Sequence, residues 1–245
     1  MRVDLEPCVI LHRRAYRDTS LMLDVFSREH GRVALIARGA RRPKARWRGI
    51  LEPLRVLQLS WSGRGEMQTL TAAESQPQST APTGDRLYAA FYGAELVMRL
   101  TGREDPHPYL YDRVIELIDA LCNEAPMAPE LRRFERDLLA ELGYGLLLDV
   151  ETESGDPVVG DNNYFYHPEH GIRIADARPF AAELPVGGAS LLALADGTLS
   201  TPTQLNEARR VLAAALQPHL GGKPLRSSQT LRAMRRLKQS GAQQQ

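Results

Sequence analysis

The chain has 245 residues, with 31 lysines and arginines against 30 aspartates and glutamates, so its formal net charge is +1. This length fits one large domain or two small ones, and a chain of this size can fold without a disulfide or metal staple. Its two cysteines, Cys8 and Cys122, exclude a disulfide framework and a four-thiolate zinc site. We expect both cysteines to be buried as small hydrophobic side chains.

No apolar run reaches the roughly 18 residues that a membrane span requires. The N-terminus also lacks the layout of a signal peptide, because acidic residues precede a short apolar run that Arg13 and Arg14 end. We therefore expect a cytoplasmic protein in a reducing compartment.

The near-neutral total hides an uneven distribution of charge. Residues 1–80 carry +6, residues 81–150 carry −6, residues 151–220 carry −5 and residues 221–245 carry +6. Such asymmetry bears on the partners of a protein rather than on its fold. Each charged block taken alone is explained most simply as a solvated surface. Local motifs are therefore needed to decide whether a block binds a partner.

Short apolar runs in the first 75 residues predict five β-strands, at residues 7–12, 20–26, 31–37, 53–61 and 66–74. Five short strands in so few residues suit a small closed barrel. The five-stranded OB barrel is the leading candidate, and an SH3-like barrel is its competitor. We assign residues 1–80 to this barrel domain.

Residues 75–84 read as a linker, after which the period of the apolar residues becomes helical. The first helix runs to about Leu100 and is capped by Thr83 or Asp85. A second follows the prolines at 106 and 108, and a third runs from Pro129 to Gly143.

Residues 164–175 read as a β-hairpin inserted among the helices. Residues 190–195 form a short helix, and Thr203 caps another that Pro218 ends. A last helix is predicted at residues 230–238, before a disordered tail at 239–245. The predicted fold class is thus α+β, an OB barrel followed by a helical domain at residues 81–238 with a small hairpin.

The densest chemical feature is a basic loop at residues 38–48 with six cations and no acid. Its residues of interest are Arg38, Arg41, Arg42, Lys44, Arg46, Trp47 and Arg48. Cations neutralise phosphates, and an aromatic ring in the same groove can stack on an unpaired base. The alternative is a solvated loop in which Trp47 packs inward.

A second basic patch lies at residues 221–238 and includes Lys223 and Arg226. His167 and His170 lie on a turn, which argues against a metal site on one helix face. The sequence contains no nucleophile elbow, complete dinucleotide fingerprint or paired-cysteine motif, so no residue argues for an enzyme or a cofactor, although these absences alone do not exclude an enzyme.

Four segments resemble the RecO family of bacterial DNA repair proteins, which are recombination mediators. They are SLMLDVFSREHGRVALIARGARR at residues 20–42, GILEPLRVLQL at 49–59, LRRFERDLLAELGYG at 131–145 and LQPHLGGKPLRS at 216–227. They span the whole length in the right order. The resemblance implies an OB barrel, a helical domain and no enzymatic activity.

The resemblance also implies partners. Members bind single- and double-stranded DNA, anneal complementary strands, dock on the acidic C-terminal tail of single-stranded DNA-binding protein (SSB) and, with RecR, help to load RecA. The family's basic loop falls on the cationic residues 38–48, and a second basic surface falls on Lys223 and Arg226. The place of such a protein is the bacterial cytoplasm, in association with the nucleoid.

The family motif for docking the SSB tail falls on Leu131, Arg132, Arg133 and Phe134. An apolar pocket suits the ring of such a tail, and a guanidinium suits its free carboxylate. The sequence leaves open which of the two arginines makes the contact.

Some branches of this family carry a four-cysteine zinc module near residues 145–180, whereas this chain has no cysteine there. The resemblance therefore implies that the hairpin at residues 164–175 replaces the module. Two other functions remain open on the residues alone, a non-catalytic protein-interaction scaffold and an RNA-binding OB protein.

Overall fold

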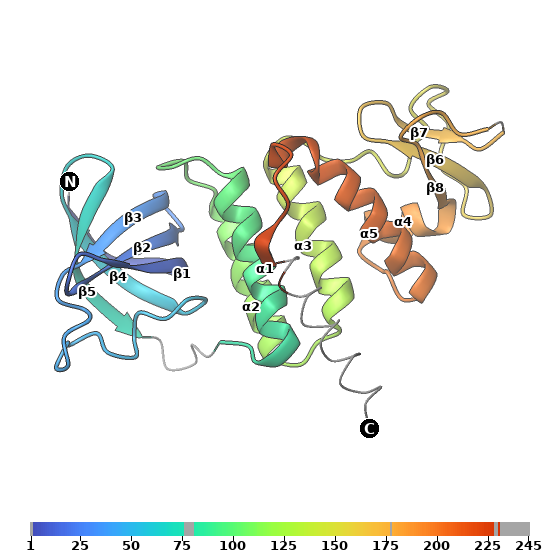
Figure 1. The fold of residues 1–245 in the computed structure, drawn as a ribbon. Coiled ribbons are helices and arrows are strands. Elements are labelled where there is room, and N and C mark those ends of the chain that lie inside the picture. Colours follow the sequence, from blue (N-terminus) through green and yellow to red (C-terminus); the bar gives the residue numbers. More distant parts are fainter. Residues whose placement is uncertain (1, 76–80, 177, 228–229, 231–245) are drawn as a thin grey trace. The chain divides into compact units, whose positions relative to one another are not determined.

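The computed structural model describes residues 2–75, 81–176, 178–227 and 230 (Figure 1). The chain divides into two compact units, one made of Met1–Ala125 with Pro224–Gln245 and the other of Pro126–Lys223. The first two helices thus group with the barrel. The predicted boundary between a barrel domain at residues 1–80 and a helical domain at residues 81–238 stays a prediction.

Five strands close into a barrel in the order β1-β2-β3-β5-β4 (Figure 1). They are β1 (Arg2–Tyr16), β2 (Ser20–Ser27), β3 (Gly31–Ala37), β4 (Val56–Ser62) and β5 (Met67–Ser75). Neighbouring strands are antiparallel, except that β3 and β5 run parallel. This arrangement confirms the predicted OB barrel over its SH3-like competitor.

Strand β1 is much longer than the predicted run at residues 7–12. Its first half pairs with β4 and its second half with β2, with register shifts between Val3 and Glu6 and between Ile10 and His12. Such irregularities bend a strand and help it to serve two neighbours in a small barrel. The last part of β1, from His12 to Ala15, is exposed and contains Arg13 and Arg14. A search for apolar runs therefore does not detect it.

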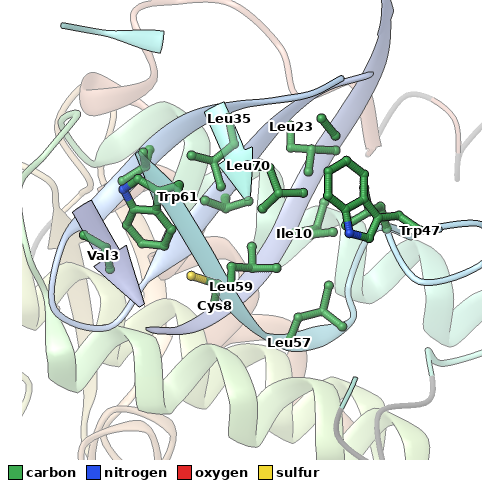
Figure 2. Close-up of a cluster of buried hydrophobic side chains, with 14 residues drawn as sticks. Val3, Cys8, Ile10, Leu23, Leu35, Trp47, Leu57, Leu59, Trp61 and Leu70 are labelled. Carbon is green, nitrogen blue, oxygen red and sulfur yellow. The ribbon is translucent and has the colours of Figure 1, made fainter. Parts of the chain in front are cut away.

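The barrel interior is filled by alternate side chains of the strands together with two residues of the β3–β4 loop. The buried cluster comprises Val3, Cys8, Ile10, Leu23, Val25, Val33, Leu35, Ala37, Trp47, Leu51, Leu57, Leu59, Trp61 and Leu70. In Figure 2 the two indoles lie at opposite ends of the cluster, with Leu70 and Ile10 between them. Burial raises the pKa of the Cys8 thiol well above its ordinary value, as suits the predicted buried cysteine.

Helices α1 (Gly84–Leu100) and α2 (Pro108–Cys122) complete the described part of the first unit, apart from a short C-terminal segment. Thr83 is the N-cap residue of α1, as predicted, but its hydroxyl makes no capping hydrogen bond. Cys122 is only half-buried, contrary to expectation, because it is the last residue of α2.

Arginines of the barrel connect it to the two helices. Arg28 donates hydrogen bonds from Nε and Nη2 to the two carboxylate oxygens of Asp112 in α2, at 3.2 and 3.1 Å. Arg32 donates to the carbonyls of Met98 and Thr101, at the C-terminal end of α1. These carbonyls at the helix end lack intrahelical partners, so the half-buried Arg32 is well placed to satisfy them.

The second unit contains α3 (Met127–Glu141), α4 (Gly188–Asp196) and α5 (Pro202–Leu216). Helix α3 begins two residues before Pro129, because the first N–H groups of a helix need no intrahelical partner and proline fits the first turn. Arg136 of α3 donates to the carbonyls of Leu194 and Ala195, at 3.0 and 2.7 Å, and so joins α3 to the end of α4.

The start of α5 differs from the prediction. Its N-cap is Thr201 rather than Thr203, with Pro202 in the first turn. The Thr201 hydroxyl accepts from the backbone of Gln204, whose side chain accepts from the backbone of Thr201. This reciprocal capping box outweighs the second threonine as a start signal. Pro218 begins a separate 3-10 turn, Pro218–Leu220.

The predicted hairpin is present as β6 (Asn163–His167) and β7 (Gly171–Ile174), joined by a third strand, β8 (Leu184–Gly187), on the other edge of β6. The sequence analysis missed β8 because it is four residues long and contains Pro185, which weakens a strand signal. His167 and His170 stack on the hairpin turn at 4.5 Å between ring centres.

Several predictions fall outside the described residues. These are most of the linker, at residues 76–80, most of the last helix and the whole of the tail at residues 239–245.

A pair of glycine substitutions tests how tightly the barrel meets the helices. A Cβ added to Gly31 lies 2.1 Å from the backbone carbonyl oxygen of Asp105, whereas one added to Gly49 meets nothing within 4 Å. Both glycines have positive φ, which costs alanine about 1–2 kcal/mol. Urea unfolding should show Gly31→Ala to be more destabilising than Gly49→Ala by roughly 1–3 kcal/mol. Equal losses would contradict the close approach.

Candidate nucleic-acid interface

The basic loop joins β3 to β4 across one end of the barrel. A run of short backbone turns builds residues 39–48 of this loop. Its hydrogen bonds run from Arg42 N to Gly39 O, from Ala45 N to Arg42 O and from Arg48 N to Ala45 O. Gly39 has a φ of +69°, which glycine adopts without the steric cost that a side chain brings. The turns pack many cations into a short length of chain.

Trp47 packs inward, so the expectation that it stacks on a base is wrong. Its side chain belongs to the buried core cluster and is only 7 % exposed. The Cζ atom of Arg46 lies 4.1 Å from the centre of its ring. Because the ring packs against the barrel core on one side and the guanidinium of Arg46 on the other, its main role is to hold the loop in place.

Three of the six cations are bonded to backbone carbonyls. Arg41 donates to the carbonyls of Arg17 and Asp18, both at 3.3 Å, and so reaches the β1–β2 turn. Arg46 donates to the carbonyl of Thr71 in β5 at 2.6 Å. Arg48 donates within the loop, to the carbonyl of Pro43. These guanidinium groups tie the loop to its surroundings while remaining exposed.

The other three cations, Arg38, Arg42 and Lys44, are exposed and make no side-chain hydrogen bond or ion pair with any residue that the structure describes. Placing like charges together is unfavourable unless solvent or an anionic ligand compensates them. These three side chains are therefore the best placed to meet phosphate groups.

Two adjoining hollows form a groove beside the loop, called here the β5-side groove. One has a volume of about 680 Å³ and the other about 670 Å³. They share Arg38, Gly39, Arg42 and Thr69 as lining residues. The groove therefore runs past all three of the unpaired cations, since Lys44 lines the second hollow.

The groove also contains residues that the sequence analysis missed. Tyr16 and Arg17, at the β1–β2 turn, line the first hollow with Met67 at the start of β5. Met67 is 48 % exposed, and it supplies an open apolar surface in place of Trp47. A signal was present in the basic run at residues 12–17, which also holds the tyrosine. Only the barrel topology places that run beside the loop.

The position of this groove is typical of OB folds that bind nucleic acids. Those folds use the face of strands 2 and 3 with the loops between strands 1 and 2 and between strands 4 and 5. Here the lining comes from the β1–β2 turn, the end of β3 and the start of β5, directly after the β4–β5 loop.

The two predicted residues of the second basic patch belong to different units. Lys223 belongs to the second unit, and Arg226 begins a short segment that lies against α1 in the first unit. Glu95 of α1 accepts hydrogen bonds from the backbone N–H groups of Arg226 and Ser227, both at 2.9 Å. Burial raises the pKa of the Glu95 carboxyl, but these bonds and one from the Ser227 hydroxyl outweigh it and hold the pKa below its ordinary value.

The four residues of the predicted tail-binding motif differ sharply in accessibility. Phe134 is 2 % exposed, and Arg132 is buried with its Nη2 atom 2.6 Å from a carboxylate oxygen of the buried Glu135. Leu131 is half-buried. Arg133 is the accessible arginine, with 44 % of its side chain exposed and a 3.4 Å ion pair to Glu130. Leu131 and Arg133 are therefore the accessible members of the motif, and the docking of an acidic tail on it stays a prediction.

An OB barrel with a cationic loop across its end defines a class of nucleic-acid-binding proteins, and the comparisons with known proteins agree with it. The family model described as Recombination protein O N terminal matches residues 1–77, and the one described as Recombination protein O C terminal matches residues 81–229. Together they cover nearly the whole chain.

Curated relatives named DNA repair protein RecO match along most of their length. Those of Ralstonia nicotianae, Halorhodospira halophila and Alkalilimnicola ehrlichii are 40 %, 43 % and 44 % identical to this chain. The alignments cover 96 %, 94 % and 96 % of this chain and 86 %, 97 % and 93 % of the relatives. The chain therefore belongs to the RecO family of DNA repair proteins, and the resemblance seen in the sequence is confirmed.

The family models are described by recombination and the relatives by DNA repair, and these names state no catalytic activity. Among the described residues, no group of three or more histidines, cysteines and carboxylates is arranged to hold a metal ion. None of the helices in the same part of the chain is long and apolar enough to cross a membrane.

Removing the ring of Trp47 tests its role in holding the loop. Trp47→Ala should lower the free energy of unfolding by about 3–5 kcal/mol, because it empties one end of the barrel core. Urea denaturation measures the loss, and Tyr16→Ala serves as the control, since Tyr16 lines the groove outside the core cluster. A loss below about 1 kcal/mol for Trp47→Ala would contradict the burial of the ring.

Proposed function

We propose that this protein binds single- and double-stranded DNA by its phosphate backbone, anneals complementary strands and, with RecR, helps to load RecA onto DNA coated by SSB. It acts in the bacterial cytoplasm, in association with the nucleoid. Membership of the RecO family supports this proposal for DNA repair in general.

The observation that carries DNA binding is the set of three unpaired cations, Arg38, Arg42 and Lys44, along the β5-side groove. Contacts from arginine and lysine to phosphates are independent of sequence and release counterions. The exposed cations of the groove can hold the backbone of any sequence through its phosphates, with accessible bases lying against Tyr16 and Met67.

Annealing follows from the same chemistry. Two complementary strands repel each other through their phosphates, and cations that neutralise part of this charge lower the barrier to their encounter. Because the protein holds strands by the backbone, their base edges remain available for pairing.

Docking on the SSB tail is assigned to the exposed side of α3. Arg133 is the arginine that can reach a partner's carboxylate, and the half-buried Leu131 lies two residues before it. Arg132 has a structural role, because its partner Glu135 is 2 % exposed and needs a counter-charge.

The triple variant Arg38→Ala, Arg42→Ala and Lys44→Ala tests the DNA interface. Filter binding of single-stranded DNA at several salt concentrations should show weaker binding to all sequences alike. The slope of log affinity against log salt should fall by about 2, since each lost phosphate contact removes about 0.7. These side chains make no bond to other described residues, so the free energy of unfolding should stay unchanged.

The matched control removes three exposed cations that do not line the groove, Arg2, Arg178 and Arg209. An equal change of slope in both triple variants would show that net charge, and not the groove, governs binding. If unlabelled RNA displaced the labelled DNA from the protein better than unlabelled DNA does, the result would favour an RNA-binding OB protein. Absence of binding to either would favour an interaction scaffold.

Arg133→Ala and Arg132→Ala separate docking from stability. Arg133→Ala should weaken binding of a peptide copy of the SSB tail with little change in unfolding free energy, because its ion pair is exposed. Arg132→Ala should cost about 3–5 kcal/mol, because it removes one member of a buried ion pair, the guanidinium that lies 2.6 Å from the Glu135 carboxylate. Fluorescence anisotropy and urea denaturation measure the two effects, and undiminished peptide affinity in Arg133→Ala would refute the docking site.

A further inference from the structure

A second cationic hollow lies on the other flank of the basic loop. It has a volume of about 330 Å³ and is called here the β1-side hollow. Its lining residues are Arg13, Arg14, Ala15, Leu21, Ala40, Arg41, Trp47, Arg48, Gly49, Leu51 and Glu52. Four of these residues are arginines, and one is acidic.

The barrel topology separates this hollow from the β5-side groove. The loop crosses from β3 to β4, and in the closed order β1-β2-β3-β5-β4 this path leaves β5 on one flank and β1 with β2 on the other. The groove takes lining residues from β5, such as Thr69 and Leu70, and from the β1–β2 turn, whereas the hollow takes Arg13 and Arg14 from β1 before that turn and no residue from β5. Trp47 lines both, so the loop is the wall between them.

The charges of the β1-side hollow are held in place without being fully compensated. Arg13 is paired with Glu52 at 2.7 Å, and both side chains are 37 % exposed. The guanidinium of Arg14 lies against the sulfur of Met22, at 3.0 Å from Nη2. One carboxylate among four guanidinium groups leaves a clear excess of positive charge.

The form of the hollow favours a phosphate backbone over an acidic peptide. A peptide tail with an aromatic residue needs an open apolar pocket, but the large apolar residues here, Leu21, Trp47 and Leu51, are half-buried or buried. What the hollow presents is a set of forked donors, which match the oxygen atoms of phosphate groups.

We propose that the β1-side hollow holds the backbone of a second DNA strand, so that one barrel carries two strands on the two flanks of a single loop. The inference rests on the proposed DNA binding in the β5-side groove and extends it to annealing. Two strands held beside the same wall of cations meet at a raised local concentration, which is the physical requirement for faster pairing.

Counting strands per chain tests this directly. Native mass spectrometry with short oligothymidine strands of about ten nucleotides, within the site sizes of single OB folds, should find two strands per protein chain. The double variant Arg14→Ala and Arg48→Ala should bind one strand per chain and keep its affinity for that first strand. The matched control is the double variant Arg38→Ala and Arg42→Ala, which removes two arginines of the β5-side groove instead.

Annealing kinetics provide the second readout. In the Arg14→Ala and Arg48→Ala variant, annealing of two labelled complementary strands should slow by about tenfold or more, since hydrogen bonds to charged groups are each worth about an order of magnitude in an equilibrium constant. Urea denaturation checks that the variant folds. Should it fail to fold, Arg14→Gln with Arg48→Gln takes its place.

A substitution that should strengthen second-strand binding provides a test that a loss of protein stability cannot mimic. Glu52→Gln removes the one carboxylate of the hollow and frees the charge of Arg13. It should raise affinity for the second strand and speed annealing, with first-strand binding unchanged. Loss of annealing in the arginine variant together with gain in Glu52→Gln supports the second site.

Other outcomes reject the inference in distinguishable ways. One strand per chain in the unaltered protein, or normal annealing in the arginine variant, overturns the second site while leaving the first. Loss of binding to an acidic tail peptide instead of DNA assigns the hollow to a protein partner. Absence of any DNA binding by the unaltered protein overturns the proposed function itself.

Discussion

The cationic end of this protein depends on the burial of one indole ring. Within residues 38–48, all of which the structure describes, Trp47 is the residue whose side chain belongs to the buried cluster of the barrel. Six cations in eleven residues repel one another, and a loop of this composition has little apolar surface of its own to fix it. Burying a large aromatic side chain offsets that repulsion and fixes where the charges point.

With the ring in place, neighbouring arginines take different roles. The guanidinium of Arg41 reaches the carbonyls of the β1–β2 turn and ties two loops together, while Arg42, the next residue, extends into the β5-side groove without a described partner. Anchored and unpaired cations are interspersed along the same short segment. The anchored ones keep the shape of the surface, and the unpaired ones have all their hydrogen-bond donors available for phosphates.

The barrel does not stand alone in the first unit. Arg28 and Arg32 bind α2 and the end of α1, and the close approach of Gly31 to Asp105 leaves no room for a side chain there. The two family models meet near residue 80, yet the contacts group α1 and α2 with the barrel. The boundary in the sequence pattern and the boundary in packing are therefore different, because a helix pattern reveals an apolar face but not the element that covers it.

The sequence by itself determined most of the element types, a small five-stranded barrel and the basic loop, because alternation, helical spacing and runs of charge are local properties, whereas the strand order decided for the OB barrel. The family resemblance also rested on linear motifs. Only the tertiary structure decided that Trp47 faces the core, that Arg132 is buried while Arg133 is exposed, and that Arg13, Arg14 and Arg17 lie beside the loop. Each of these results depends on which strands and helices pack together. The spacing of residues within one segment cannot predict burial or charge pairing between residues that are distant in the sequence.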